Sequence, residues 1–195
     1  MNEKVLNTII GAVKNNVKRC CDNNEDFIPV GLIIKDENIT SVCSMLFRST
    51  EEKIEAYKKL GYHCAEEGSY QIGFAVDCKY RPIRKEDADY TRDNWDTEKP
   101  STYPLSMQKH AVLLKIINFK DSDEVYWMPY SIDSGKPVFD ETEKIPIPQD
   151  DEYRRYFSDG FMDKIVRSRE VEGDMNDFFN SIANEFPNVA EERNL

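Results

Sequence analysis

Asp77, Cys78 and His110 are the residues whose types and spacing could support catalysis. Asp77 and Cys78 open the run DCKYR, and a cation beside a thiol lowers the thiol pKa and favours the nucleophilic thiolate. Lys79 or Arg81 would supply that cation, and His110 would act as the base if the intervening chain brings it close. This pattern predicts a small hydrolase-type enzyme with its site at the end of the DCKYR run.

The same run also allows Cys78 to be inert. Apolar and polar residues alternate over residues 70–80, and the alternation places Cys78 on the same side as Phe74 and Val76. A free cysteine in such a position behaves as a small apolar side chain of the core. Whether the chain is an enzyme therefore stays open at this point.

A different kind of site is indicated by residues 81–109. This segment is polar and holds three prolines, which predicts a long irregular loop. Six residues at its start and within it are of the types enriched at protein interfaces: Tyr80, Arg81, Tyr90, Arg92, Trp95 and Tyr103. Because Trp, Tyr and Arg supply most of the binding energy at interfaces, we expect a non-catalytic protein-protein interaction or regulatory module. The partner would be another protein or a second copy in a homodimer; the alternative is that the rings hold the loop on the sheet.

The sequence lacks the spacings that mark other common chemistries. It has two histidines and no CxxC, HxH or HExxH pattern, so we expect no metal site. The phosphate-binding patterns GxxxxGK[ST] and GxGxxG and the hydrolase pattern GxSxG are also missing, and we expect no cofactor. Five scattered cysteines, an odd number, are typical of a reducing cytoplasm.

Charge narrows the range of partners. The net charge of -11 would repel a phosphate backbone, which argues against direct nucleic-acid binding. Residues 150–195 carry twelve acidic and six basic side chains, so these residues form either a solvated surface or an acidic face that mimics nucleic acid and inhibits a basic protein. No apolar run is long enough for a membrane span and no signal peptide precedes the first helix, so we expect no membrane contact and a cytoplasmic location.

The elements that would position these residues can be read from periodicity in the first half of the chain. Apolar residues at helical spacing predict a helix over 3–20, and residues 27–35 and 39–47 alternate as a β-hairpin. The capping box that starts at Ser49 begins a second helix. Residues 70–80 give the strongest strand pattern, and we expect Gly73 and Ala75 to lie under the helix that begins at Ser49.

The second half predicts another hairpin, over 110–120 and 124–133, followed by a short edge strand at 137–139 and an extended connector, IPIP. Two helices follow, at 150–169 and 174–186, and the residues after Pro187 are expected to be a frayed tail. We therefore expect a single domain, 1–195, of the α+β class. It would have a mainly antiparallel sheet of five to six strands, helices packed on one face, an irregular loop at 81–109 and a C-terminal helical pair at 150–186.

Overall fold

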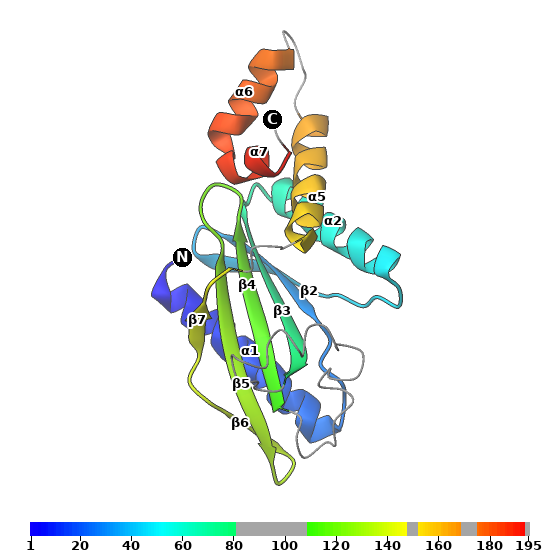
Figure 1. Ribbon diagram of the computed structural model, residues 1–195, viewed down its shortest axis with the longest axis vertical. Coiled ribbons are helices and arrows are strands. Elements are labelled where there is room, and N and C mark those ends of the chain that lie inside the picture. Colours follow the sequence, from blue (N-terminus) through cyan, green and yellow to red (C-terminus); the bar gives the residue numbers. More distant parts are fainter. Residues whose placement is uncertain (81–108, 148–151, 169–174, 194–195) are drawn as a thin grey trace, which may run out of the picture.

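The computed structural model describes residues 1–80, 109–147, 152–168 and 175–193 (Figure 1). The helices are α1 (Glu3–Asn23), α2 (Thr50–Glu66), α5 (Glu152–Ser168), α6 (Met175–Glu185) and α7 (Pro187–Arg193). The strands are β1 (Val30–Lys35), β2 (Asn38–Ser44), β3 (Gln71–Tyr80), β4 (Lys109–Asn118), β5 (Glu124–Asp133), β6 (Lys136–Phe139) and β7 (Glu143–Ile145). The predicted α+β class with an antiparallel sheet is confirmed.

The seven strands form one antiparallel sheet in the order β2-β1-β3-β4-β5-β6, and β7 also pairs with β5. Strand β3 lies between β1 and β4, so the prediction of a central strand over residues 70–80 is confirmed. The first hairpin closes where Lys35 pairs with Asn38, across Asp36 and Glu37, whose φ angles are 48° and 61°. A two-residue turn with positive φ at both positions matches the right-handed twist of the strands, which fixes this register.

Hydrophobic residues pack on both faces of the sheet. Side chains alternate along a strand, so Leu32 and Ile34 of β1 face α1 whereas Ile33 faces α2 and α5. Helix α1 covers the first face with the stripe Val5, Ile9, Val13 and Val17. Figure 1 shows α1 crossing the sheet on the side away from α2 and α5. The helices are therefore divided between the two faces rather than packed on one face as expected, because β1, β3 and β4 carry apolar side chains on both.

The placement expected for Gly73 and Ala75 is wrong. Ala75 is fully buried in the cluster that includes α1, and a methyl group at Gly73 would meet Leu32 and Ile116, which belong to that same cluster. Helix α2, which begins at the Ser49 cap as predicted, instead packs on the larger side chains of β3, Ile72 and Phe74. The small residues of β3 therefore lie on the α1 side of the sheet. The side chains of Leu32 and Ile116 fill the space beside Gly73.

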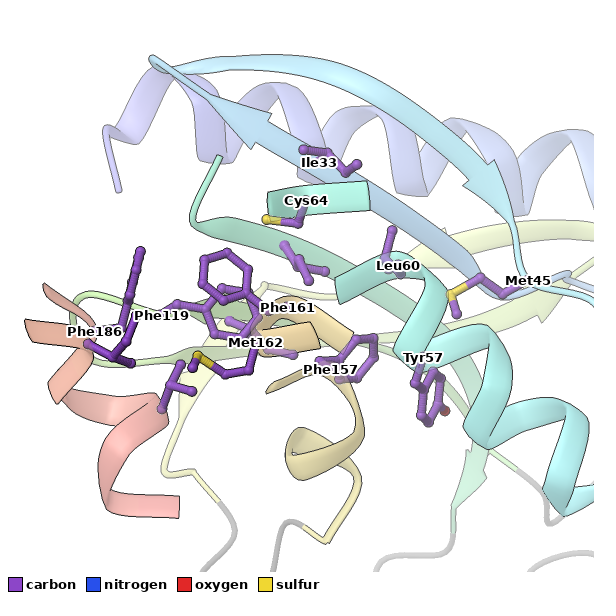
Figure 2. Packing of buried hydrophobic residues seen from close by; sticks show 14 residues of the cluster. Ile33, Met45, Tyr57, Leu60, Cys64, Phe119, Phe157, Phe161, Met162 and Phe186 are labelled. Carbon is purple, nitrogen blue, oxygen red and sulfur yellow. The ribbon is translucent and has the colours of Figure 1, made fainter. Parts of the chain in front are cut away.

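Helices α2 and α5 cross at unusually short range because a glycine of each helix faces the backbone of the other. A Cβ at Gly61 would lie 2.0 Å from the carbonyl oxygen of Phe157, and a Cβ at Gly160 would lie 1.8 Å from that of Lys58. Around this crossing the rings of Tyr57 and Phe157 stack at 4.5 Å (Figure 2). The cluster on this face continues through the side chains Leu60, Cys64, Phe119, Phe161, Met162 and Phe186 (Figure 2).

Two features at the C-terminal side differ from the sequence-based expectation. The residues after Phe186 form helix α7 rather than a frayed tail, with Pro187 as the first helical residue. Proline is well suited to that position, since its missing N–H would have had no partner in the helix. Val189 is completely buried in the cluster beside Phe186, which provides the packing that holds this short helix. Residues 143–145, expected to precede an extended connector, pair with β5 as β7.

Candidate functional site

Asp77 and His110 lie close together on the face of the sheet that α1 covers. The hydroxyl of Tyr130, on β5, donates a 2.8 Å hydrogen bond to Asp77 Oδ1. His110 Nδ1 is 4.0 Å from Asp77 Oδ2, which is within ion-pair range but too long for a hydrogen bond. The rings of His110 and Tyr130 are neighbours, with centroids 5.3 Å apart. Three adjacent strands thus bring a carboxyl, a phenol and an imidazole together.

The electrostatics of this group are dominated by burial. Burial raises the pKa of Asp77, although the hydrogen bond from Tyr130 and the charge of His110 act in the opposite direction. Burial and the neighbouring carboxylate also raise the pKa of Tyr130, so the phenol remains protonated and continues to donate. The arrangement stabilises a half-buried carboxyl in an apolar face, and a carboxyl with a raised pKa could also transfer a proton.

The third predicted catalytic residue, Cys78, is not part of this group. It follows Asp77 on a strand, so its side chain projects from the opposite face of the sheet. Its thiol donates to the carbonyl oxygen of Ala111 at 3.2 Å, and burial raises its pKa to about 11, with the charge of Asp77 adding to the effect. The structure therefore brings Asp77 and His110 together and leaves the thiol, in its unreactive protonated form, apart from the imidazole.

Only one of the predicted binding residues lies in a described part of the chain. Tyr80 ends β3 on the same face as Cys78, and its ring meets that of Trp127 edge-on, with centroids 5.0 Å apart. This contact corresponds to the alternative in which aromatic residues pack on the sheet. The other five, Arg81, Tyr90, Arg92, Trp95 and Tyr103, fall outside the described residues, as does the predicted loop 81–109.

A groove lies between strand β2 and helix α2 in the described part of the chain. Its volume is about 880 Å³, and its floor includes Ile33 and Leu60. One side is formed by residues 41–46, where Val42 and Leu46 are 67% and 74% exposed. The other side is the outer surface of α2, which contributes Glu51, Glu52, Glu55, Lys59 and His63 and leads to Glu67. An extended strand edge thus faces an acidic helix across an apolar floor.

The two walls of the groove are tied together at one end by Glu67. Its carboxylate accepts hydrogen bonds from the hydroxyls of Thr40 and Ser41 on β2, and these bonds lower its pKa. Lys35, at the end of β1, donates to the carbonyl oxygen of Glu67 at 2.7 Å. Because β2 is fixed to the end of α2 in this way, the strand edge is held in an extended form beside the helix.

This groove was not among the sites predicted from the sequence. The capping box at Ser49 correctly placed Glu51 and Glu52 at the start of α2, but acidic residues there are common because they favour the helix dipole. The available signal was the high share of polar residues in β2, namely Asn38, Thr40, Ser41 and Ser44. Whether a strand is central or at an edge depends on pairing between distant segments, which no local pattern of the 39–47 stretch reveals.

Comparison of the chain with protein-family models, curated proteins and solved structures found no match. Within the described ranges, no three His, Cys, Asp or Glu side chains are grouped so that they could hold a metal ion. None of the helices in those ranges combines the length and apolar character needed to cross a membrane. The class of protein is therefore defined by the architecture of the described residues: an antiparallel sheet with α1 on one face and a layer of helices on the other.

Proposed function

We propose that the chain is a non-catalytic interaction module that binds an extended, basic segment of a protein partner as an added strand along β2. The observation that carries this proposal is the position of β2. Among the strands described, it pairs with β1 alone, so one row of its backbone N–H and C=O groups faces the groove side without a neighbouring strand. Such an edge is the usual template for β-strand addition, in which main-chain hydrogen bonds supply the affinity.

The negative charge of the groove favours a partner segment with positive charge. Four glutamates line it, Glu51, Glu52, Glu55 and Glu67, against one lysine and one histidine. Hydrogen bonds from its own backbone N–H and from the Ser49 hydroxyl lower the pKa of Glu51, which favours the ionised carboxylate. A strand that carries Lys or Arg toward α2 would therefore be attracted, and an acidic strand would be repelled.

The spacing of the partner's residues follows from strand geometry. Side chains of an added strand point alternately to the two faces of the sheet. On one face they meet the acidic surface of α2, and on the other they lie next to exposed Val42, which pairs with Leu32 on the α1 side. The expected ligand is thus a segment in which basic and β-branched apolar residues alternate.

The proposal can be tested with defined peptides and fluorescence anisotropy. A fluorescein-labelled peptide of alternating Lys and Val should bind, whereas a Glu-Val peptide and a Lys-Val peptide with N-methylated amides should not. In the variant Glu51→Lys/Glu55→Lys the affinity for Lys-Val should fall about tenfold, as expected when two attractive rim charges become repulsive. The control Asp22→Lys/Glu141→Lys changes the net charge equally at exposed sites away from the groove.

Two results would contradict this function. Equal loss of binding in the groove variant and in the control would show that only net charge matters, and binding of the N-methylated peptide would exclude strand addition. A second copy of the chain is the other possible occupant of the β2 edge. Light scattering that shows a dimer, dissociated by Val42→Lys, would assign the edge to self-association instead of a basic partner.

A further inference from the structure

A second cavity, of about 400 Å³, lies between the sheet, α2 and α5 on the face opposite α1. Five aromatic rings contribute to its lining, together with four aliphatic or proline side chains and two lysines. The rings belong to Phe47, Tyr57, Phe74, Tyr153 and Phe157, the other apolar residues are Pro29, Val76, Leu113 and Val125, and the lysines are Lys53 and Lys115. The volume falls in the range of small-ligand sites, and its aromatic lining is typical of them.

The walls of this cavity belong to packed helices and paired strands. Tyr57 and Phe157 stack on each other where α2 crosses α5 (Figure 2), and Tyr57 also meets Phe74 edge-on at 5.2 Å. Val76 and Leu113 are paired residues of the central strands β3 and β4. The cavity is therefore a space bounded by three strands, β3, β4 and β5, and by the helices α2 and α5.

Among the described residues, the two charged groups that line the cavity are both cations. Lys115 lies on the sheet side, where it forms an ion pair with Asp123 at 3.5 Å, and burial lowers its pKa to about 8. Lys53 lies on the helix side, with its ammonium 4.1 Å from the ring centroid of Tyr153 and 5.7 Å from that of Tyr57. In the described part of the chain, Lys53 contacts aromatic rings and forms no ion pair with a carboxylate.

We propose that this cavity binds a small, flat, apolar molecule that carries one carboxylate, with its apolar body against the aromatic rings and its carboxylate on Lys53. The aromatic lining provides the contact area, and Lys53 provides the charge-assisted hydrogen bond that orients the ligand. Aromatic cavities elsewhere often bind organic cations, but here the ammonium groups of Lys53 and Lys115 would repel a second cation. The site is separate from the β2 groove, and neither Lys53 nor Lys115 lines that groove.

The charge preference is tested with three probes of the same shape: 2-naphthoate, 2-naphthylmethanol and 2-naphthylmethylammonium. Binding is measured by isothermal titration calorimetry and by ligand-detected NMR. We expect naphthoate to bind most tightly, the alcohol about tenfold more weakly, and the ammonium compound not at all, as for a hydrogen bond to a charged group. Equal affinities for all three, or no saturable binding of naphthoate, would overturn the proposal.

Two variants then locate the site. Lys53→Met keeps the aliphatic stem but removes the charge, so it should weaken naphthoate about tenfold and leave the alcohol within about twofold. Val76→Phe fills the cavity from β3 and should abolish binding of both probes, and Leu113→Phe repeats this from β4 if the first variant fails to fold. Unchanged naphthoate affinity in Lys53→Met or in a folded filled variant would refute the assignment. Peptide binding at the β2 groove should be the same in Lys53→Met, so failure of this site leaves the interaction function intact.

Discussion

The close crossing of α2 and α5 predicts that replacing either of its glycines with alanine destabilises the protein. A single methyl group added at Gly61 would lie 2.0 Å from the carbonyl oxygen of Phe157, and one at Gly160 would lie 1.8 Å from that of Lys58. Ordinary van der Waals contact begins near 3.4 Å. The atoms in the way are backbone atoms of the facing helix, which cannot rotate aside as a side chain can, so the two helices must move apart.

The size of the effect follows from two opposing contributions. Alanine favours a helix over glycine by about 1 kcal/mol, which stabilises the variant. Separation of the helices by about 1 Å or more forfeits a quarter to a half of each dispersion contact across the interface, and overpacking of this kind costs about 1–3 kcal/mol or more. Because a clash with backbone is at the upper end, we expect Gly61→Ala and Gly160→Ala each to lower the free energy of unfolding by about 2 kcal/mol.

Urea unfolding followed by circular dichroism measures this difference, with Gly11→Ala as the control. Gly11 lies within α1 and has no atom within 4 Å of an added Cβ, so alanine there should raise the stability by about 0.5–1 kcal/mol. Replacing glycine with alanine should thus lower the free energy of unfolding at the α2–α5 crossing and raise it in α1. If Gly61→Ala is as stable as the unmodified protein, or follows Gly11→Ala, the close crossing does not exist as described.

Three further predictions concern pH, thiols and the C-terminal helix. Burial raises the pKa of Asp77 above its ordinary 3.8, so the folded state holds that proton more tightly than the unfolded state. The stability that this group contributes is present below pH 3.8 and is lost as the pH rises through the raised pKa of the folded state. Over this pH window, urea titrations should show the free energy of unfolding of the wild type falling relative to that of Asp77→Asn. A constant difference between the two proteins would contradict the raised pKa. Iodoacetamide at pH 8 should label the exposed Cys43 first and Cys78 only on unfolding, which peptide mass spectrometry can measure. Rapid labelling of Cys78 in the folded protein would restore the hypothesis of a thiol-dependent enzyme. Val189→Ala should cost about 1.5 kcal/mol in thermal unfolding, from two buried methyl groups, whereas Val138→Ala, on a half-exposed side chain, should cost less than about 0.5 kcal/mol.

Much of the fold could be predicted because its strongest features are local. The alternation over residues 70–80 identifies the central strand, and the Ser49 capping box identifies the start of α2. What could not be predicted depends on distant pairs of segments. The two faces of β3 are both apolar enough to bury, so its sequence does not tell which helix packs on which face. Helix α7 was missed because proline was taken as a stop, although it equally suits a first helical position.

For the candidate sites too, local features could be predicted from the sequence and contacts between distant segments could not. Adjacent residues on a strand point to opposite faces, so the proximity of Asp77 and Cys78 in sequence guaranteed that they could not act on one side of the sheet. Tyr130 was not identified as the hydroxyl that contacts Asp77, because it lies two strands away and its partner is set by the register of β3, β4 and β5. The β2 groove and the aromatic cavity are products of packing between helices and the sheet, and no short motif encodes them.

The position of α1 has a consequence for synthesis of the chain. This helix is made before any strand of the sheet, and the buried residues of the face that it covers extend as far along the chain as Tyr130 of β5. At about 5–20 residues per second, the roughly 100 intervening residues take on the order of 5–20 seconds. During that interval the stripe that includes Ile9 and Val17 has no completed surface to pack on, so its apolar side chains stay exposed on the growing chain.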